Sequence, residues 1–244
     1  MTKIRERLPT IREDYIRSHN WRKENRIQDC TTWGGYMSDH RMFAVCAYVL
    51  DHDVAGFFEH MKECVEYSLK ELQHMTTNES PVNMDYGYYQ DILYALTAGD
   101  LDASIKATQL NEKVNLKKPK PPAVPLYFHK AFRLLILGQV DFLHDLEEME
   151  EVFAKKEKSF LGYAQCFKAI YKNDVDGFYQ GFDLMMKGHK RLCHPYGMFG
   201  NSADEVLAIW PLAVVNLARF KGLDVSINHP LVPQELVTKQ LGGL

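Results

Sequence analysis

The sequence predicts an all-α protein built from stacked antiparallel helical hairpins, with an apolar C-terminal helix at the centre. Apolar residues recur at helical spacing through most of the 244 residues. Four short junctions between predicted helices also resemble one another along the chain. Finally, residues 206–218 contain no charge and a single polar residue, Asn216, so a helix there must be enclosed by other elements. We therefore expect one all-α domain over residues 1–244.

The N-terminal half begins with an amphipathic helix within residues 1–26. Its apolar residues at helical spacing are Leu8, Ile11, Tyr15 and Ile16. Residues 28–37 contain the Gly34-Gly35 pair and are predicted to form a loop, after which Ser38 caps a helix that ends at Leu50. Three further helices are expected at residues 54–75, 86–98 and 101–114. The short segment 223–227, near the other end of the chain, alternates as a strand would.

A proline-rich segment at residues 115–125 is predicted to join two halves of the domain, residues 1–114 and 126–244. Its four prolines cannot lie in a helix interior and favour an extended chain. Four helices are expected after it, at residues 126–137, 140–156, 159–172 and 175–194.

The four similar junctions are predicted to be tight turns between antiparallel helices. In each, a residue that tolerates left-handed backbone ends one helix, and an aspartate or its substitute opens the next. The first residues of these pairs are His52, Gly99, Gly138 and Asn173, and the second are Asp53, Asp100, Gln139 and Asp174. We therefore interpret Asp51, His52 and Asp53 as turn and cap residues rather than as catalytic groups.

The apolar C-terminal helix is predicted to start directly after Ser202. Ser202 and Glu205 have the spacing of a capping box, and Gly222 is placed to end the helix in a left-handed conformation. Pro211 would remove the hydrogen bond to the carbonyl of Leu207 and bend the helix there.

Composition limits the partners and the compartment. A net charge of -3 does not indicate nucleic acid or an anionic membrane surface as a partner. The five cysteines are an odd number without a repeated short spacing, which argues against a disulfide framework. The N-terminus lacks the uninterrupted apolar core of a secretory signal. We expect a soluble cytoplasmic protein.

The sequence contains no motif for a common catalytic or cofactor site. A zinc-peptidase HExxH, a phosphate-binding loop, a GxGxxG and a GxSxG are all missing, so we expect neither catalysis nor a cofactor. His189, Cys193 and His194 come nearest to a metal cluster, but His189 lies on an apolar stripe and is expected in the core. An active site assembled only by folding stays open as an alternative, with the candidate histidines His52, His60, His129 and His189.

An acidic run at residues 141–151 is the predicted partner-binding surface. It carries six acidic residues and no Lys or Arg, so it would attract a basic partner and raise the association rate, although a merely solvated face is the alternative. The predicted contact residues are Asp145, Glu147, Glu148, Glu150 and Glu151.

The C-terminal half contains two groups of residues in a recognisable order. The later group comprises Leu217, Arg219, Gly222, Leu223, Val225, Pro230, Pro233 and Leu236. The earlier group comprises Ala169, Ile170, Asn173, Asp174, Phe178, Phe182 and the basic run His189, Lys190 and Arg191. Together they resemble the bacterial immunity protein 49 family over roughly residues 126–236.

This resemblance implies an all-α immunity protein of a polymorphic toxin system used in interbacterial competition. Such a protein neutralises a cognate protein toxin by binding it. The resemblance identifies neither the toxin nor a binding residue, and the oligomeric state stays open. The alternative function is a helical-repeat scaffold or regulator that binds a peptide or protein in its groove.

Overall fold

The computed structural model describes residues 3–25, 30–77, 89–115 and 122–244, and it confirms the all-α prediction. Within these ranges no strand forms, and one isolated bridge joins His229 to Val232. The α-helices are α1 (Lys3–Glu24), α2 (Cys30–Asp51), α3 (Val54–Thr77), α4 (Tyr89–Thr97), α5 (Leu101–Asn115), α6 (Ala123–Leu137), α7 (Leu143–Lys155), α8 (Leu161–Lys172), α9 (Val175–Leu192) and α10 (Ile209–Phe220). Three 3₁₀ turns are η1 (Val140–Phe142), η2 (Ala203–Glu205) and η3 (Gln234–Leu236).

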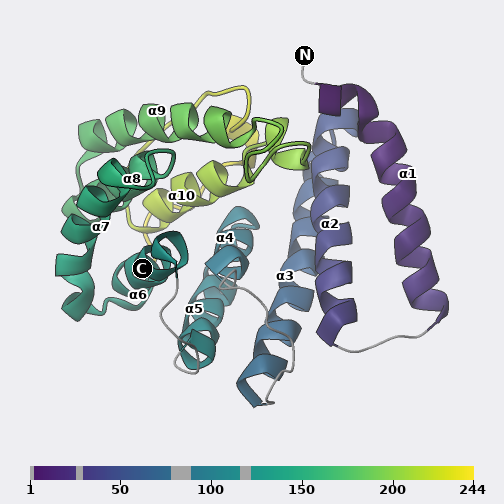
Figure 1. Ribbon diagram of the computed structural model, residues 1–244, viewed down its shortest axis with the longest axis horizontal. Coiled ribbons are helices and arrows are strands. Elements are labelled where there is room, and N and C mark those ends of the chain that lie inside the picture. The colour runs from purple at the N-terminus through teal and green to yellow at the C-terminus, as the bar shows by residue number, and fades with distance from the viewer. Residues whose placement is uncertain (1–2, 26–29, 78–88, 116–121) are drawn as a thin grey trace.

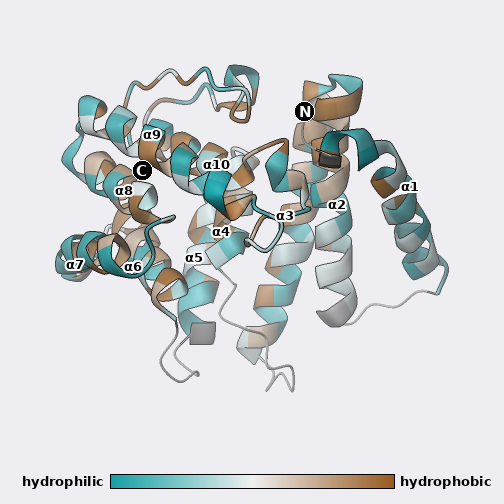
Figure 2. Cartoon of the chain, turned by 45° about the horizontal axis from the view of Figure 1, so that its top comes forward, coloured by the Kyte–Doolittle hydropathy of each residue, from teal (hydrophilic) through white to brown (hydrophobic). Residues whose placement is uncertain are grey.

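The helices stack as four hairpins, α2–α3, α4–α5, α6–α7 and α8–α9 (Figure 1). Successive hairpins touch through α3 with α4 and α5, α5 with α6, and α7 with α8. Helix α1 lies at one edge against α2, and α10 packs between α4 and the α8–α9 hairpin. Hydrophobic residues gather on the helix sides that meet other helices, whereas the outward sides of α1 and α7 are largely hydrophilic (Figure 2). The buried residues form one contiguous core through both halves.

The four predicted turns are confirmed. Each contains a residue with left-handed backbone, at φ values of 55° for His52, 69° for Gly99, 69° for Gly138 and 54° for Asn173. Three of the predicted caps accept a backbone N–H hydrogen bond: Asp53 from Gly56, Asp100 from Ala103 and Asp174 from Gly177. Gln139 differs, because its side chain accepts from Arg133 Nε at 2.7 Å and η1 intervenes before α7.

The loop predicted at residues 28–37 is wrong, because α2 begins at Cys30 and continues through Gly34 and Gly35. These glycines allow a close approach by side chains of other helices. A Cβ on Gly34 would lie 3.5 Å from the Glu71 carboxylate, and one on Gly35 would lie 3.1 Å from the Arg22 guanidinium. The pair therefore serves packing within the helix rather than a turn.

The boundary of the proline-rich segment also needs correction. Helix α6 begins at Ala123, with Pro122 at its N-cap and Pro125 in its first turn, where a missing N–H costs no helical hydrogen bond. Asn115 closes α5. Residues 116–121, and residues 86–88 of the predicted fourth helix, lie outside the described ranges.

The start of the last helix is corrected as well. Ser202 caps the short turn η2, and α10 begins only at Ile209. Glu205 accepts from the backbone N–H of Asn201 at 2.6 Å instead of completing a capping box with Ser202. Because Pro211 is the third residue of α10, the predicted bend at Leu207 is wrong.

The end of α10 and the segment after it show one success and one failure of prediction. Gly222 adopts φ 89° and follows the helix, as expected. Residues 223–227 do not form a strand. Burial nevertheless alternates along this segment: Leu223, Val225 and Ile227 are buried and the residues between them are exposed. The extended segment packs one side against the helices without pairing to another strand.

Helix α10 occupies the core, as its composition predicts. Every residue from 209 to 218 is buried, and the ring of Trp210 contacts the rings of Tyr89 and Phe199 at centroid distances of 5.3 and 5.0 Å. Its polar residue, Asn216, donates to the carbonyl of Leu96 at 2.8 Å and accepts from the backbone N–H of Thr238 at 2.9 Å. No described helix has the length and apolar character needed to cross a membrane.

Candidate functional site

The predicted acidic surface lies on α7, which exposes one side of the helix. Its other side is buried through residues at helical spacing, namely Leu146, Met149 and Phe153. The structure therefore separates the five predicted acidic residues into two groups.

Two of the acidic residues are held by basic residues of neighbouring helices. Lys130 Nζ on α6 lies 2.5 Å from Asp145 Oδ1, and Lys168 Nζ on α8 lies 2.7 Å from Glu150 Oε2. The hydrogen bond from Lys168 also holds the pKa of Glu150 below its usual value. These ion pairs attach α7 to α6 and α8. The carboxylates of Asp145 and Glu150 are therefore engaged within the chain and are less available to a partner.

The other three acidic residues, Glu147, Glu148 and Glu151, are exposed. Glu151 lies 3.7 Å from the exposed Lys155, a contact that water screens strongly. Burial, and then a hydrogen bond with Glu148, raises the pKa of Tyr127 to about 12. Glu147 makes no ion pair with a described residue.

Two exposed apolar residues, one on η1 and one at the start of α7, precede these glutamates in the chain. Val140 and Leu143 are 67% and 41% exposed. Leu143, Glu147 and Glu151 follow one another at four-residue spacing, so they share one side of the helix. We call Val140, Leu143, Glu147, Glu148 and Glu151 the α7 face. Sequence reasoning missed its apolar part, although Leu143 falls outside the stripe that buries Leu146, Met149 and Phe153.

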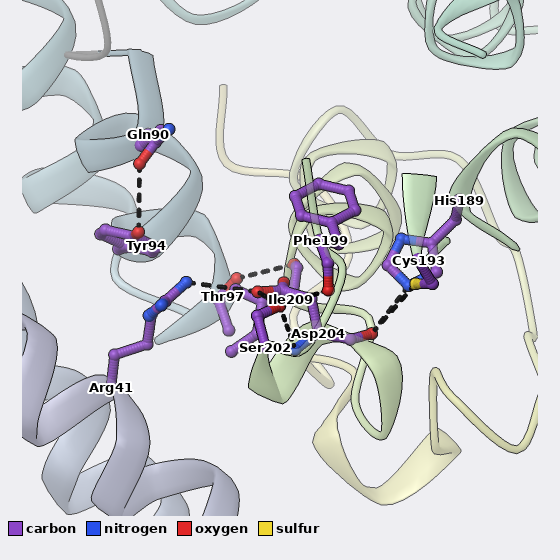
Figure 3. A network of polar contacts seen from close by, with 10 residues as sticks. All are labelled: Arg41, Gln90, Tyr94, Thr97, His189, Cys193, Phe199, Ser202, Asp204 and Ile209. Carbon is purple, nitrogen blue, oxygen red and sulfur yellow. Dashed lines mark hydrogen bonds and ion pairs between the residues drawn. The ribbon is translucent and has the colours of Figure 1, made fainter. Parts of the chain in front are cut away.

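A buried polar network lies where the two halves of the stack meet (Figure 3). Arg41 on α2 lies 3.3 Å from Asp204 Oδ2, and the Asp204 carbonyl accepts from His189 Nε2 on α9 at 2.8 Å. Ser202 Oγ accepts from the backbone N–H of Asp204 at 3.2 Å. His189 is fully buried, which confirms the prediction of a core histidine, and burial lowers its pKa. The network therefore connects η2 to α2 in the N-terminal half and to α9 in the C-terminal half.

The same network holds the loop at residues 193–201 in place. Phe199 is buried against the His189 ring at 5.1 Å. A Cβ on Gly197 or Gly200 would lie 2.2 Å from a backbone carbonyl oxygen, so only glycine fits there. The loop presents Tyr196 to solvent with 96% of its surface exposed. This is a second ordered surface with an aromatic side chain, which sequence reasoning did not single out.

Two buried carboxyl groups were also missed. Glu71 on α3 and Asp91 on α4 are 6% and 7% exposed. Burial raises the pKa of Glu71 to about 7 and that of Asp91 well above its usual value. Each falls on an apolar stripe of its own helix, a signal that could have identified them. In the described part of the chain, no group of three or more His, Cys, Asp or Glu side chains is placed to bind a metal ion.

The four histidines proposed for an active site assembled only by folding lie on different elements. His52 is in the α2–α3 turn, His60 on α3, His129 on α6 and His189 on α9. Across the described ranges, no hydrogen bond or ring contact joins one of these four to another. His60 instead contacts a different histidine, His40, at the α2–α3 interface.

Comparisons with known protein families, curated proteins and solved structures found no match. The resemblance to the immunity protein 49 family therefore stays a prediction that rests on the sequence pattern alone.

Proposed function

We propose that this chain is an immunity protein of a polymorphic toxin system, which binds a basic cognate toxin in the bacterial cytoplasm and blocks it sterically. The observation that supports a binding role most directly is the α7 face, where exposed carboxylates adjoin exposed apolar side chains. After the internal ion pairs of Asp145 and Glu150 are set aside, three acidic residues are exposed to solvent, and Glu151 among them makes only a surface contact with Lys155.

The composition of this face suits a tight and specific protein contact. Acidic residues that face a basic partner accelerate encounter and select against acidic competitors. Apolar side chains that become desolvated in the centre of an interface supply most of the affinity. Val140 and Leu143 are placed for the second role, and Glu147, Glu148 and Glu151 for the first.

The scaffold alternative receives less support from the packing. A peptide-binding helical repeat keeps the inner side of its stack open for the ligand. Here α10 fills the space between α4 and the α8–α9 hairpin, and its residues 209–218 are buried. The chain's own helix thus fills this part of the stack.

The test is coexpression with the neighbouring toxin gene, scoring rescue of growth and recovery of a stable complex. We expect the triple variant E147K/E148K/E151K to keep its fold but to associate about tenfold or more slowly at low ionic strength. The matched control reverses three exposed acidic residues of α1, Glu6, Glu13 and Glu24, and so changes the net charge equally. Stopped-flow fluorescence or surface plasmon resonance gives the association rate.

The outcomes separate the two parts of this proposal. Absence of both rescue and complex for the unmodified chain would contradict the immunity function. Rescue with equal association rates for the α7 variant and the α1 control would leave the function standing and refute the α7 face as its binding surface.

The apolar part of the face has its own expected effect. The substitution Leu143→Ala should raise the dissociation rate of the toxin complex about tenfold, because a desolvated anchor is worth roughly 1–2 kcal/mol. The stability of the free chain should change by less than about 0.5 kcal/mol, since Leu143 is exposed. Ile16→Ala is the matched control, because Ile16 is 44% exposed on α1. Equal dissociation rates for the two variants would show that Leu143 does not lie in the interface.

A further inference from the structure

Three histidines from three helices meet where α1, α2 and α3 come together. His19 lies on α1, His40 on α2 and His60 on α3. The ring centroids of His19 and His40 are 5.2 Å apart, and those of His40 and His60 are 5.6 Å apart. The Nδ1 atoms of His40 and His60 face each other at 3.4 Å. We call these three side chains the histidine seam.

The seam adjoins one of the two ion-pair attachments of α1 to α2 seen in the described residues; the other joins Arg12 to Asp51 at 2.6 Å. His19 Nδ1 lies 3.1 Å from Asp39 Oδ2, and the guanidinium of Arg22 donates to both oxygens of the same carboxylate. Asp39 is almost fully buried at 1% exposure. One buried carboxylate on α2 therefore holds two side chains of α1, and the imidazole of His40 packs directly against this attachment.

The contact between His40 and His60 requires at least one neutral imidazole. Two Nδ1 atoms at 3.4 Å can share a hydrogen bond only while one of them carries no proton. If both rings were protonated, two N–H donors would point at each other beside His19. Burial first, and then the nearby His19, His60 and Lys23, lower the pKa of His40 to about 4, against a weaker opposing effect of Glu66.

His60 is shifted in the same direction. Burial is the main cause of its lowered pKa, and His19 adds to it, while Glu59, Glu63 and Asp53 act in the opposite sense. The acidic residues of α3 thus reduce the penalty for charging His60 without removing it.

Protons can reach the seam from two surface clefts. One cleft is lined by Lys23 of α1, His40 of α2 and Glu59, His60, Lys62, Glu63 and Tyr67 of α3. The other is lined by Arg12 and Ile16 of α1, Phe43, Ala47 and Asp51 of α2, and His60. Both clefts are open to solvent, so the imidazoles of His40 and His60 need no unfolding of the core to meet water.

We propose that the histidine seam is an acid-sensitive latch, which holds α1 on α2 near neutral pH and releases it below about pH 6. Helix α1 is suited to such a movement because it is the edge helix of the stack and packs mainly on α2 (Figure 1). Its release would uncover the side of α2 that carries Phe43 and Ala47. This inference is independent of the toxin-binding function.

The sign of the pH dependence follows from the preference for the neutral form. His40 and His60 bind protons more weakly in the closed seam than in the open one, so their contribution to stability is complete above the ordinary histidine pKa of about 6.5. That contribution is lost as the pH falls from about 6.5 toward 4. A full return of the His40 pKa to its ordinary value on release of α1 would raise the equilibrium constant for opening about tenfold between roughly pH 7.5 and roughly pH 5.5.

The experiment is hydrogen exchange of the full chain across this pH range, corrected for the intrinsic pH dependence of amide exchange. We expect protection of residues 12–24 to fall about tenfold while that of α9 stays constant. The double variant H40Q/H60Q should keep the protection of α1 within about twofold over the range. His144→Gln is the matched control because His144 is an exposed residue of α7, and this variant should behave like the unmodified chain.

Two results would overturn the latch. The first is an equal loss of α1 protection in H40Q/H60Q and in the unmodified chain. The second is a parallel loss in α1 and α9, because that pattern is global unfolding. Should the double variant fail to fold, histidine ¹³C NMR of the unmodified chain decides: imidazoles of His40 and His60 that titrate near pH 6.5 with α1 still protected refute the proposal.

Discussion

Replacing Gly162 with valine should destabilise the chain by about 3 kcal/mol or more, because α8 and α9 touch through their backbones at this point. A Cβ on Gly162 would lie 2.1 Å from the backbone nitrogen of Met185. Gly188 makes the reciprocal contact, with its Cβ position 2.0 Å from the carbonyl oxygen of Ser159. A larger side chain would force the two helices apart, and overpacking in a dense core typically costs roughly 1–3 kcal/mol and sometimes more.

Denaturation by urea, followed by circular dichroism, measures this effect. For a chain of this length a loss of about 3 kcal/mol corresponds to a fall of about 6–12 °C in Tm. Ala154→Val on the exposed side of α7 adds two of the same three carbons outside the core, and we expect less than about 0.7 kcal/mol from it. If Gly162→Val is as stable as this control, the close α8–α9 contact is wrong.

These glycines show what local sequence patterns can and cannot predict. The turns at His52, Gly99, Gly138 and Asn173 were predictable because a left-handed residue followed by a cap is a local requirement. Glycines that let helices approach depend on neighbours far along the chain. The same reasoning explains the error at Gly34 and Gly35, where a local rule indicates a loop but Arg22 and Glu71 occupy the space beside a continuous helix.

The candidate site likewise has features that local sequence patterns predict and features that they do not. The acidic run of α7 is visible in the sequence, and the position of Glu147 and Glu151 on an exposed side follows from helical spacing. The engagement of Asp145 and Glu150 was not predictable, because Lys130 and Lys168 belong to other helices. The exposure of Leu143 was missed for a related reason: only the packed structure shows which apolar side chains no other element covers.

Sequence patterns could not predict the histidine seam or the Asp204 network. Their members come from helices that are distant in the chain, and no residue spacing links His19 to His60 or Arg41 to Asp204. His189 alone was placed correctly, since the apolar stripe of α9 predicts its burial. Local periodicity therefore predicts burial well and polar partners poorly.

The substitution Asn216→Leu should destabilise the chain by about 2–5 kcal/mol, although leucine is close to asparagine in size. Asn216 is fully buried and satisfies the carbonyl of Leu96 and the backbone N–H of Thr238. Leucine can replace neither hydrogen bond, so two backbone groups would lose their partner, at about 1–3 kcal/mol for each that stays buried. The C-terminal segment would also lose one of its attachments to α10, although the backbone N–H groups of Gly242 and Leu244 still donate to the carbonyls of Arg219 and Phe220. This loss should make residues 238–244 more accessible to proteolysis.

Thr97→Val provides the matched comparison at the same α4–α10 contact. It removes one buried hydrogen bond, from the Thr97 hydroxyl to the carbonyl of Ile209 at 3.1 Å, and preserves the shape of the side chain. We expect a loss of about 1 kcal/mol and no new proteolysis at the C-terminus, because that carbonyl lies near the start of α10 and Thr97 does not touch the tail hydrogen bond. Urea denaturation and timed proteolysis distinguish the two variants. If both lose the same stability and keep the same tail, Asn216 does not join α4, α10 and the C-terminal segment.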